Sequence, residues 1–302
     1  MEQRLQTIVD QLNEYAEQYY RYDNPTVTDG EYDALFDELL ALEKQTGIIL
    51  PDSPTRRVGG TPIQGFSQHA HLGRLWSLDK CRSKEEVVAW EQRIQKLHDA
   101  GAGLPPLRYA LEYKIDGLTI NLTYQNGRLV QAATRGNGVV GEGILAQVQT
   151  IRSIPLTIPF DGTMEVQGEG FMPLSSFEAY NKTAEEPLKN ARNAAAGALR
   201  NLDPAVTAAR KLDAFFYNVG YIEGKELSSL PEMLAFLQEN GLKISPKVQY
   251  FDSAVEAYDQ AMKMAQSRKM EDFLTDGMVI KVCDFATRQV LGQTERFPRW
   301  AM

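Results

Sequence analysis

The hydrophobic pattern of this 302-residue chain changes its period near residue 110. Over residues 3–20, apolar side chains recur at the spacing of an amphipathic helix. Over 118–124, apolar and polar residues alternate, as they do on a half-buried strand. Asn126-Gly127 then supplies a hairpin turn, and 129–135 returns as the partner strand. The pattern therefore predicts helices at the front of the chain and an antiparallel sheet behind them.

A capping box predicts the start of a second helix. Thr28 and Glu31 have the spacing at which each side chain satisfies the backbone amide of the other residue. This helix is expected to end at Gly47, and Asn24-Pro25 separates it from the first one. The two helices form a small N-terminal unit. Residues 51–73, rich in Pro, Gly, Ser and Thr, are expected to be a linker or an extended wrap.

The rest of the pattern adds further elements of both kinds. Ser83 is expected to cap a helix that ends near Leu97. Strands are predicted over 164–168, 215–219 and 276–282, and helices over 177–182, 193–202, 231–240 and 254–269. The predicted fold class is α+β, with a two-helix subdomain in front of an antiparallel sheet.

Composition excludes several classes of protein. The chain has 32 Lys and Arg against 40 Asp and Glu, a net charge of −8, so any DNA contact must be local rather than a general coating. Cys81 and Cys283 are too few for a disulfide framework or an all-cysteine zinc site. Apolar runs are far shorter than the ~18 residues of a membrane span, and the N-terminus turns polar at once. We therefore expect no membrane contact, no signal peptide and a cytoplasmic location.

Three charged residues alternate along the strand predicted before residue 118. Because alternate residues of a strand share a face, Glu112, Lys114 and Asp116 are expected to point the same way. A solvated strand face would give the same pattern. The other interpretation makes Lys114 a nucleophile, which requires burial or nearby positive charge to favour the free amine. Lys281 is a candidate source of that charge, and its alternative is an edge-strand lysine whose ammonium reaches water.

These residues carry a resemblance to a known family. Residues 112–117 contain the Lys-x-Asp-Gly element of covalent nucleotidyltransferases, which are the DNA and RNA ligases and the capping enzymes. Further segments, in the order of that family, make nearly the whole chain similar to the bacterial NAD-dependent DNA ligases. They are Asp29-Gly30-Glu31-Tyr32-Asp33, Asp52-Ser53-Pro54-Thr55-Arg56-Arg57-Val58-Gly59, Ser77-Leu78-Asp79, Thr134-Arg135-Gly136, Glu165-Val166-Gln167-Gly168-Glu169, Arg192-Asn193-Ala194-Ala195-Ala196-Gly197, Asp276-Gly277-Met278-Val279-Ile280-Lys281-Val282 and Pro298-Arg299-Trp300-Ala301.

The resemblance implies a division of the chain and an activity. Residues 1–66 would be a helical subdomain that binds nicotinamide mononucleotide (NMN). Residues 67–302 would be an antiparallel-sheet nucleotidyltransferase (adenylation) domain of the ligase and capping-enzyme type, truncated before its last lysine-bearing strand. Lys114 would attack the α-phosphate of NAD, release NMN and hold AMP for nick sealing in DNA replication and repair. Such a fragment is not expected to seal nicks alone.

The resemblance also implies a role for each site residue. Glu112 would contact the adenine, and Lys281 would approach the phosphate. The NMN half would be held by a clasp of residues at the start of the second helix, helped by Tyr19. That clasp has a structural alternative, a helix start whose acidic residues favour the helix dipole. The remaining nucleoside contacts would come from Ser77, Leu78, Arg135 and Glu169, and the clasp itself from Asp29, Gly30, Glu31, Tyr32 and Asp33.

The implied partners follow from the same family. NAD would be the AMP donor, Mg²⁺ would be held mainly by phosphates, and no residue would be a dedicated metal ligand. Nicked double-stranded DNA would be bound through the complete protein, which would be a monomer. Arg192, Arg200, Arg210 and Lys211 lie close together in sequence and are candidates for phosphate contacts. Their alternative is a solvated helix end with ordinary basic residues.

Two other motifs are interpreted as structural. Residues 136–141 match the Gly-x-Gly-x-x-Gly dinucleotide fingerprint, but a hairpin precedes them and Pro155 comes too soon for a crossover helix. We interpret them as a glycine loop. His69 and His71 lack metal-ligand spacing with a carboxylate and are interpreted as a loop pair.

Several positions depart from the family pattern, among them three that bear on catalysis. The family usually has Asp where this chain has Asn137 and Gly143, and Arg where it has Gln167. These departures motivate a second hypothesis, a degenerate ligase paralogue that binds NAD or a partner without catalysis.

Overall fold

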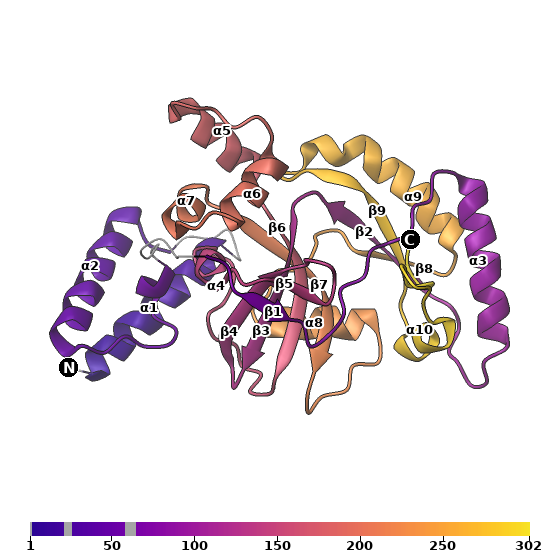
Figure 1. Ribbon diagram of the computed structural model, residues 1–302, viewed down its shortest axis with the longest axis horizontal. Helices are drawn as coiled ribbons and strands as arrows, with labels where there is room; N and C mark the ends of the chain where they lie inside the picture. The colour runs from indigo at the N-terminus through magenta and orange to yellow at the C-terminus, as the bar shows by residue number, and fades with distance from the viewer. Residues whose placement is uncertain (1, 21–25, 58–64) are drawn as a thin grey trace.

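A computed structural model describes residues 2–20, 26–57 and 65–302 of the chain (Figure 1). The N-terminal unit consists of α1 (Glu2–Tyr20), α2 (Asp29–Thr46) and the 3₁₀ turn η1 (Pro54–Arg57). The capping box at the start of α2 is present, and the helix ends at Gly47 with φ 71°, as predicted. The unit has its own apolar core, formed by Leu5, Ile8, Val9, Leu12 and Leu39.

A four-stranded antiparallel sheet forms the centre of the molecule. Its strand order is β4 (Arg128–Thr134), β3 (Leu118–Gln125), β6 (Met164–Phe171) and β7 (Asp213–Ile222). The predicted hairpin joins β3 to β4, and both turn residues have positive φ, 50° at Asn126 and 71° at Gly127. Helices α4 (Leu145–Val148), α6 (Ala191–Leu199) and α8 (Leu230–Glu239) contribute to the larger core with this sheet.

A second antiparallel sheet carries the strand of alternating charges. Its order is β8 (Gln249–Phe251), β2 (Tyr109–Ile115) and β9 (Thr275–Val282). The apolar face of β2 packs on α3 (Lys84–Asp99) and α9 (Ala254–Ser267), which lie at one end of the molecule, opposite to α1 and α2 (Figure 1). The two larger sheets meet where β2 leads into β3, and both contribute to both cores: Ala110 of β2 belongs to the larger core, and Phe171 of β6 and Phe215 of β7 belong to the second.

The remaining elements are short or peripheral. A two-stranded antiparallel sheet joins β1 (Gln68–Ala70) to β5 (Val140–Glu142). The others are α5 (Leu174–Thr183), α7 (Pro204–Ala209), η2 (Arg268–Met270) and α10 (Phe285–Leu291). Among the helices that the structure describes, none is long and apolar enough to cross a membrane.

The predicted α+β architecture is confirmed, and each long predicted element is present within a few residues of its expected bounds. Residues 136–139 lie in the loop between β4 and β5, and 140–141 begin β5, so the glycine motif opens no helix. The interpretation of 51–73 as a linker was incomplete, because η1 and β1 lie within it. The predicted break at Asn24-Pro25 lies outside the described residues, and the division at residue 66 stays a prediction.

Candidate active site

A cavity of about 1330 Å³ lies between the two larger sheets. The strand β2 and its partner β9 form one wall, and β3, β6 and β7 form the other. The segment that follows β1 closes one side. The cavity is lined by every adenylate-side residue that the sequence analysis singled out: Ser77, Leu78, Glu112, Lys114, Arg135, Glu169 and Lys281.

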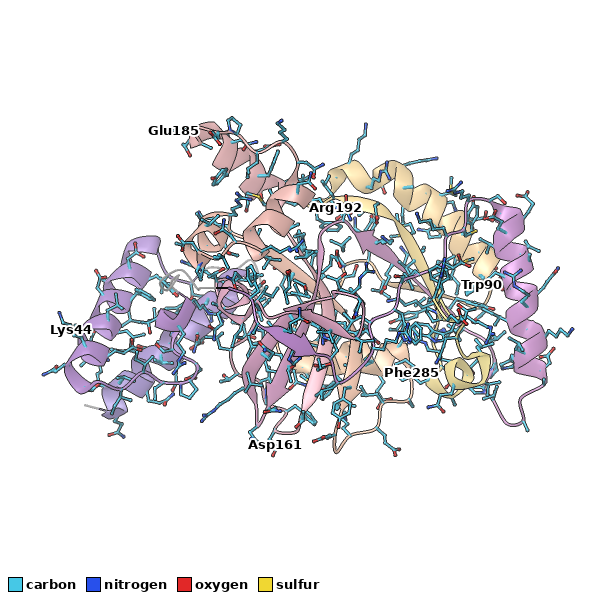
Figure 2. All side chains as sticks on the ribbon, in the orientation of Figure 1. Lys44, Trp90, Asp161, Glu185, Arg192 and Phe285 are labelled. Carbon is cyan, nitrogen blue, oxygen red and sulfur yellow. The ribbon has the colours of Figure 1, made fainter. Side chains whose placement is uncertain are left out.

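The charged residues of β2 are each paired with a residue that is distant in sequence. Lys114 Nζ donates to both carboxylate oxygens of Asp276, at 2.8 and 2.7 Å. Asp116, which directly follows β2, forms an ion pair with Arg192, whose Nε lies 3.0 Å from its Oδ1, and the labelled Arg192 of α6 lies near β2 and β9 in Figure 2. Glu112 forms an ion pair with Lys281. The row is therefore a line of ion pairs along the cavity wall.

Burial separates Glu112 from its neighbours in this row. Only 3% of Glu112 is exposed, whereas the side chain of Lys114 is 44% exposed to the cavity and solvent. The interpretation of the row as a solvated strand face is thus wrong for Glu112. Its second carboxylate oxygen, Oε2, has no hydrogen-bond partner among the described residues.

Lys281 is buried rather than exposed at a sheet edge. It is 6% exposed, its ammonium lies 5.0 Å from the ring centre of Tyr217, and burial lowers the pKa of its amine although Glu112 opposes that effect. The alternative of an edge lysine whose ammonium reaches water is therefore wrong. The ammonium of Lys281 is paired with Glu112 and lies against the ring of Tyr217 in the wall of the cavity.

Glu169 and Tyr217 form the floor of the cavity. Burial raises the pKa of Glu169 to about 7, although a hydrogen bond from Thr119 Oγ1 at 3.1 Å opposes the rise. Burial also raises the pKa of the Tyr217 hydroxyl far above its usual range. The sequence analysis did not single out Tyr217. Its position next to Phe216, whose ring is fully buried in the larger core, was the available signal that its own side chain turns to the other face of β7.

Arg135 is held by the segment that passes over the sheet. Its Nη1 donates to Ser77 Oγ at 3.2 Å, and its backbone oxygen contacts His71 Nε2 at 3.1 Å. His71 also lies near His69 and Glu165, and the three residues offer ligand atoms within 4.8 Å of one another. Sequence spacing did not predict this cluster, because Glu165 is far from both histidines in the sequence.

The structure does not bring the predicted NMN clasp to the cavity. Asp29, Gly30, Glu31, Tyr32 and Asp33 form the first turn of α2, and none of them lines the cavity. Glu31 accepts from the backbone amide and the hydroxyl of Thr28, both at 2.8 Å, and these bonds lower the pKa of its carboxyl group. The side chains of Tyr19 and Asp29 lie outside the described part of the chain.

The predicted basic cluster divides into two parts. Arg192 and Arg200, at the two ends of α6, both line the cavity, and Arg200 pairs with Glu142 at 3.0 Å. Arg210 instead donates to the backbone oxygen of Ala194 in α6 at 2.6 Å and thereby stabilises that helix. Arg210 and Lys211 are therefore not among the residues that line the cavity with Arg192 and Arg200.

The positions that depart from the family pattern keep defined local structure. Asn137 Oδ1 accepts from the backbone amides of Val139 and Val140, at 3.0 and 2.8 Å, which is the bond pattern an aspartate would make. Gln167 Oε1 accepts from Asn218 Nδ2 at 2.9 Å, and its Nε2 has no partner among the described residues.

A lysine on a strand wall that faces a nucleotide-sized cavity between two antiparallel sheets, in a Lys-x-Asp-Gly element, defines a covalent nucleotidyltransferase fold. The chain matches the NAD-dependent DNA ligase adenylation domain over residues 63–302. Residues 1–59 match the DNA ligase-like N-terminal NAD⁺-binding domain. The chain belongs to the NAD-dependent DNA ligase family.

Curated relatives support the same assignment. The chain is 56% identical over 300 residues to a DNA ligase of Alkaliphilus oremlandii, covering 99% of this chain and 45% of the relative. It is 53% identical over 304 residues to a DNA ligase of Finegoldia magna, covering 99% and 46%. The chain thus spans less than half the length of these relatives. A solved structure of mycobacterial DNA ligase D with ATP overlaps 64% of this chain and 53% of its own, at 13% identity and a TM-score of 0.37.

Proposed function

We propose that this chain carries out the self-adenylation step of an NAD-dependent DNA ligase, in which Lys114 takes AMP from NAD. The observation that supports this most is the place of Lys114 in the cavity wall, flanked by the buried Glu112–Lys281 pair. The site accommodates a nucleotide and presents a primary amine to it. The alternative of a paralogue without catalysis receives no support from the relatives, which are all named DNA ligase.

In the proposed reaction, the deprotonated amine of Lys114 attacks the α-phosphorus of the AMP half of NAD. A nitrogen–phosphorus bond forms, the phosphorus–oxygen bond to NMN breaks, and NMN leaves with the bonding electron pair. Asp276 is 2.7–2.8 Å from Nζ and is placed to accept the lysine proton before the attack. The product is AMP joined to Lys114 through a phosphoramidate.

The remaining cavity residues bind and orient the adenylate half. The unpartnered Oε2 of Glu112 is an acceptor for the adenine amino group, and the ring of Tyr217 is a stacking surface for the base. Glu169 and Arg135 would contact the nucleoside, and Lys281 would stabilise charge that develops on the phosphate. Ser77 and Leu78 would cover the adenylate from the segment after β1.

The NMN half would be bound by the helical unit. The carboxylates of Glu31 and Asp33 lie in the first turn of α2, where a cationic nicotinamide and its ribose hydroxyls would find acceptors. This assignment requires the helical unit to approach the cavity when NAD binds.

Mg²⁺ fits the site only as an ion held mainly by phosphates. Asp276 is already paired with Lys114 and Asp116 with Arg192. Among the described residues, no group of three potential metal ligands lies in the cavity. When bound, the ion would neutralise charge on the transferred phosphate.

The complete protein would use the adenylate to seal nicks in double-stranded DNA during replication and repair. Arg192 and Arg200 are the proposed phosphate contacts of this chain, since both line the cavity mouth at the ends of α6. We further propose that the protein acts as a monomer in the cytoplasm.

Intact-mass spectrometry after incubation with NAD and Mg²⁺ tests this proposal. The wild-type chain should gain the mass of one AMP, and Lys114→Ala should gain none while still binding NAD in a calorimeter. Absence of an adduct on the wild-type chain, when a complete ligase gains one in parallel, would remove the proposed activity. If calorimetry then shows unchanged NAD binding by both proteins, a module that binds NAD without catalysis is favoured.

A further inference from the structure

A segment that begins with β1 and ends at the nucleotide cavity lies against the four-stranded sheet. This strap comprises residues 68–78, begins in the β1–β5 ladder and ends with the proposed adenylate contacts Ser77 and Leu78. Gly73 approaches the sheet so closely that a Cβ at this position would lie 2.2 Å from the backbone oxygen of Gly220 on β7. The course of the strap therefore decides where Ser77 stands relative to the cavity.

A single buried carboxylate holds the middle of the strap. Glu165 on β6 is fully buried, and its Oε2 accepts from the backbone amides of Leu72 and Gly73, at 2.8 and 3.1 Å. Its Oε1 accepts from Thr123 Oγ1 at 3.2 Å and lies 3.3 Å from His69 Nε2. A carboxylate with four such neighbours is well satisfied, and a shorter side chain would leave two backbone amides without a partner.

The strap in turn holds Arg135. The backbone oxygen of Arg135 is an acceptor, so His71 donates to it from Nε2, and its Nδ1 accepts from Asn121 Nδ2 at 2.9 Å. Six residues further on, Ser77 Oγ accepts from Arg135 Nη1. One end of the strap therefore fixes the backbone of Arg135, and the other end contacts its side chain.

We propose that Glu165 is a positioning residue for nucleotide binding: it fastens the strap to β6 and thereby places Ser77, Leu78 and Arg135 around the adenylate. Glu165 does not line the cavity and takes no part in the bond changes at Lys114. Its loss should therefore weaken NAD binding and leave the chemical step nearly intact. This inference rests on the proposed self-adenylation activity.

The hydrogen bonds distinguish this role from a metal site. His69, His71 and Glu165 are close enough to share an ion, but both nitrogens of His71 and both oxygens of Glu165 already have protein partners. A metal ion would have to displace at least one of these bonds. Metal analysis of the purified protein checks this point, because a stoichiometric transition metal that is lost in Glu165→Ala would overturn the hydrogen-bonded anchor.

The main test measures self-adenylation of the full chain at increasing NAD concentrations. For Glu165→Ala we expect KM for NAD to rise by about tenfold or more, with the rate at saturating NAD within about threefold of wild type. Glu165→Gln should stay within about threefold in both constants, because an amide oxygen can still accept from the two backbone amides. If Glu165→Ala fails to fold, His71→Ala serves as the second test. It changes a partly exposed residue and should raise KM for NAD in the same way.

Asp213→Ala is the matched control. Asp213 lies at the opposite end of the same sheet, accepts from Lys243, Ser153 and the amide of Ala214, and does not touch the strap. It should lower the melting temperature without changing KM for NAD. The inference is wrong if wild type forms the adduct but Glu165→Ala and His71→Ala keep the wild-type KM, or if Asp213→Ala raises KM equally. Failure of wild type to form the adduct would instead contradict the proposed function.

Discussion

Among the residues of the site, the buried pair of Glu112 and Lys281 has the largest free-energy cost of desolvation. Both side chains are more than nine-tenths buried, and a buried ion pair recovers the cost of desolvation only in part. Such a pair is weak support for stability, yet it holds two groups of opposite charge next to Lys114 and Tyr217. Its placement therefore suits a role in binding rather than in folding.

Two substitutions separate these roles. Lys281→Met should cost about 3–5 kcal/mol of unfolding free energy, because it leaves the Glu112 carboxylate buried and unpaired. Glu112→Met combined with Lys281→Met should recover most of that loss and still form no AMP adduct. Urea unfolding followed by intact-mass analysis measures both quantities. A double variant no more stable than Lys281→Met would contradict this description of the pair.

Glu169 predicts a pH dependence. Its folded-state pKa is about 7, against 4.5 for the exposed group, so between these pH values the folded chain binds more protons than the unfolded chain. The contribution of Glu169 to the free energy of unfolding therefore falls as pH rises through this window. We expect Glu169→Gln to be about 3 kcal/mol more stable than wild type at pH 8 and nearly equal to it near pH 4.5. A stability difference that does not change with pH would count against the raised pKa.

At the scale of elements, α6 joins the cavity to the surface proposed for DNA. Arg192 and Arg200 stand at its two ends, and each is paired with an acidic residue of a neighbouring element, Asp116 or Glu142. Phosphates would have to compete with these pairs. Few contacts and a net charge of −8 give little electrostatic affinity.

We therefore expect the chain alone to bind nicked DNA no more tightly than micromolar at physiological salt. Arg200→Ala should weaken binding further and reduce the slope of log affinity against log salt by about one. Arg93→Ala, on the exposed face of α3, is the control and should change neither quantity. Fluorescence anisotropy at several salt concentrations measures both, and tight binding at physiological salt would show that the contacts lie elsewhere.

The sequence predicted the long elements and missed the short ones for a physical reason. Helices and strands of eight residues or more show their period within the chain, and caps such as Thr28 and Ser83 mark where they begin. The seven-residue helix α10 was not predicted. The three-residue strands β1, β5 and β8 contain too few residues to show a period and exist only through their partners.

The candidate site divides in the same way. The adenylate-side residues were found through several short contiguous motifs shared with the ligase family, those around Lys114 and Lys281 among them. The contact between Glu165 and the strap joins segments more than 90 residues apart, and Tyr217 depends on the pairing of β7 with β6. Spacing along the chain carries no signal for such contacts.

At the scale of the whole molecule, the helical unit and the cavity are separate. The unit has its own core and lies at one end of the molecule (Figure 1), and the residues proposed to clasp NMN are not among those that line the cavity. An NAD molecule bound by both parts would draw them together. The helical unit would then select NAD over ATP, because it contacts only the nicotinamide half.

Removal of residues 1–66 should therefore abolish adduct formation with NAD. In a complete ligase, the same deletion should spare the joining of DNA that is already adenylated, since that step no longer needs NMN. Circular dichroism of the shortened chain provides the control for folding. If the shortened chain uses NAD as well as the full chain does, the assignment of NMN binding to α2 is wrong.

The most direct test of the central claim localises the transferred group. The chain is incubated with NAD whose adenine half carries a heavy isotope, digested, and analysed by tandem mass spectrometry under conditions that preserve phosphoramidates. We expect one labelled AMP on the peptide that contains Lys114, with unlabelled NMN released in equal amount. AMP on another residue, or a labelled chain after Lys114→Ala, would contradict it.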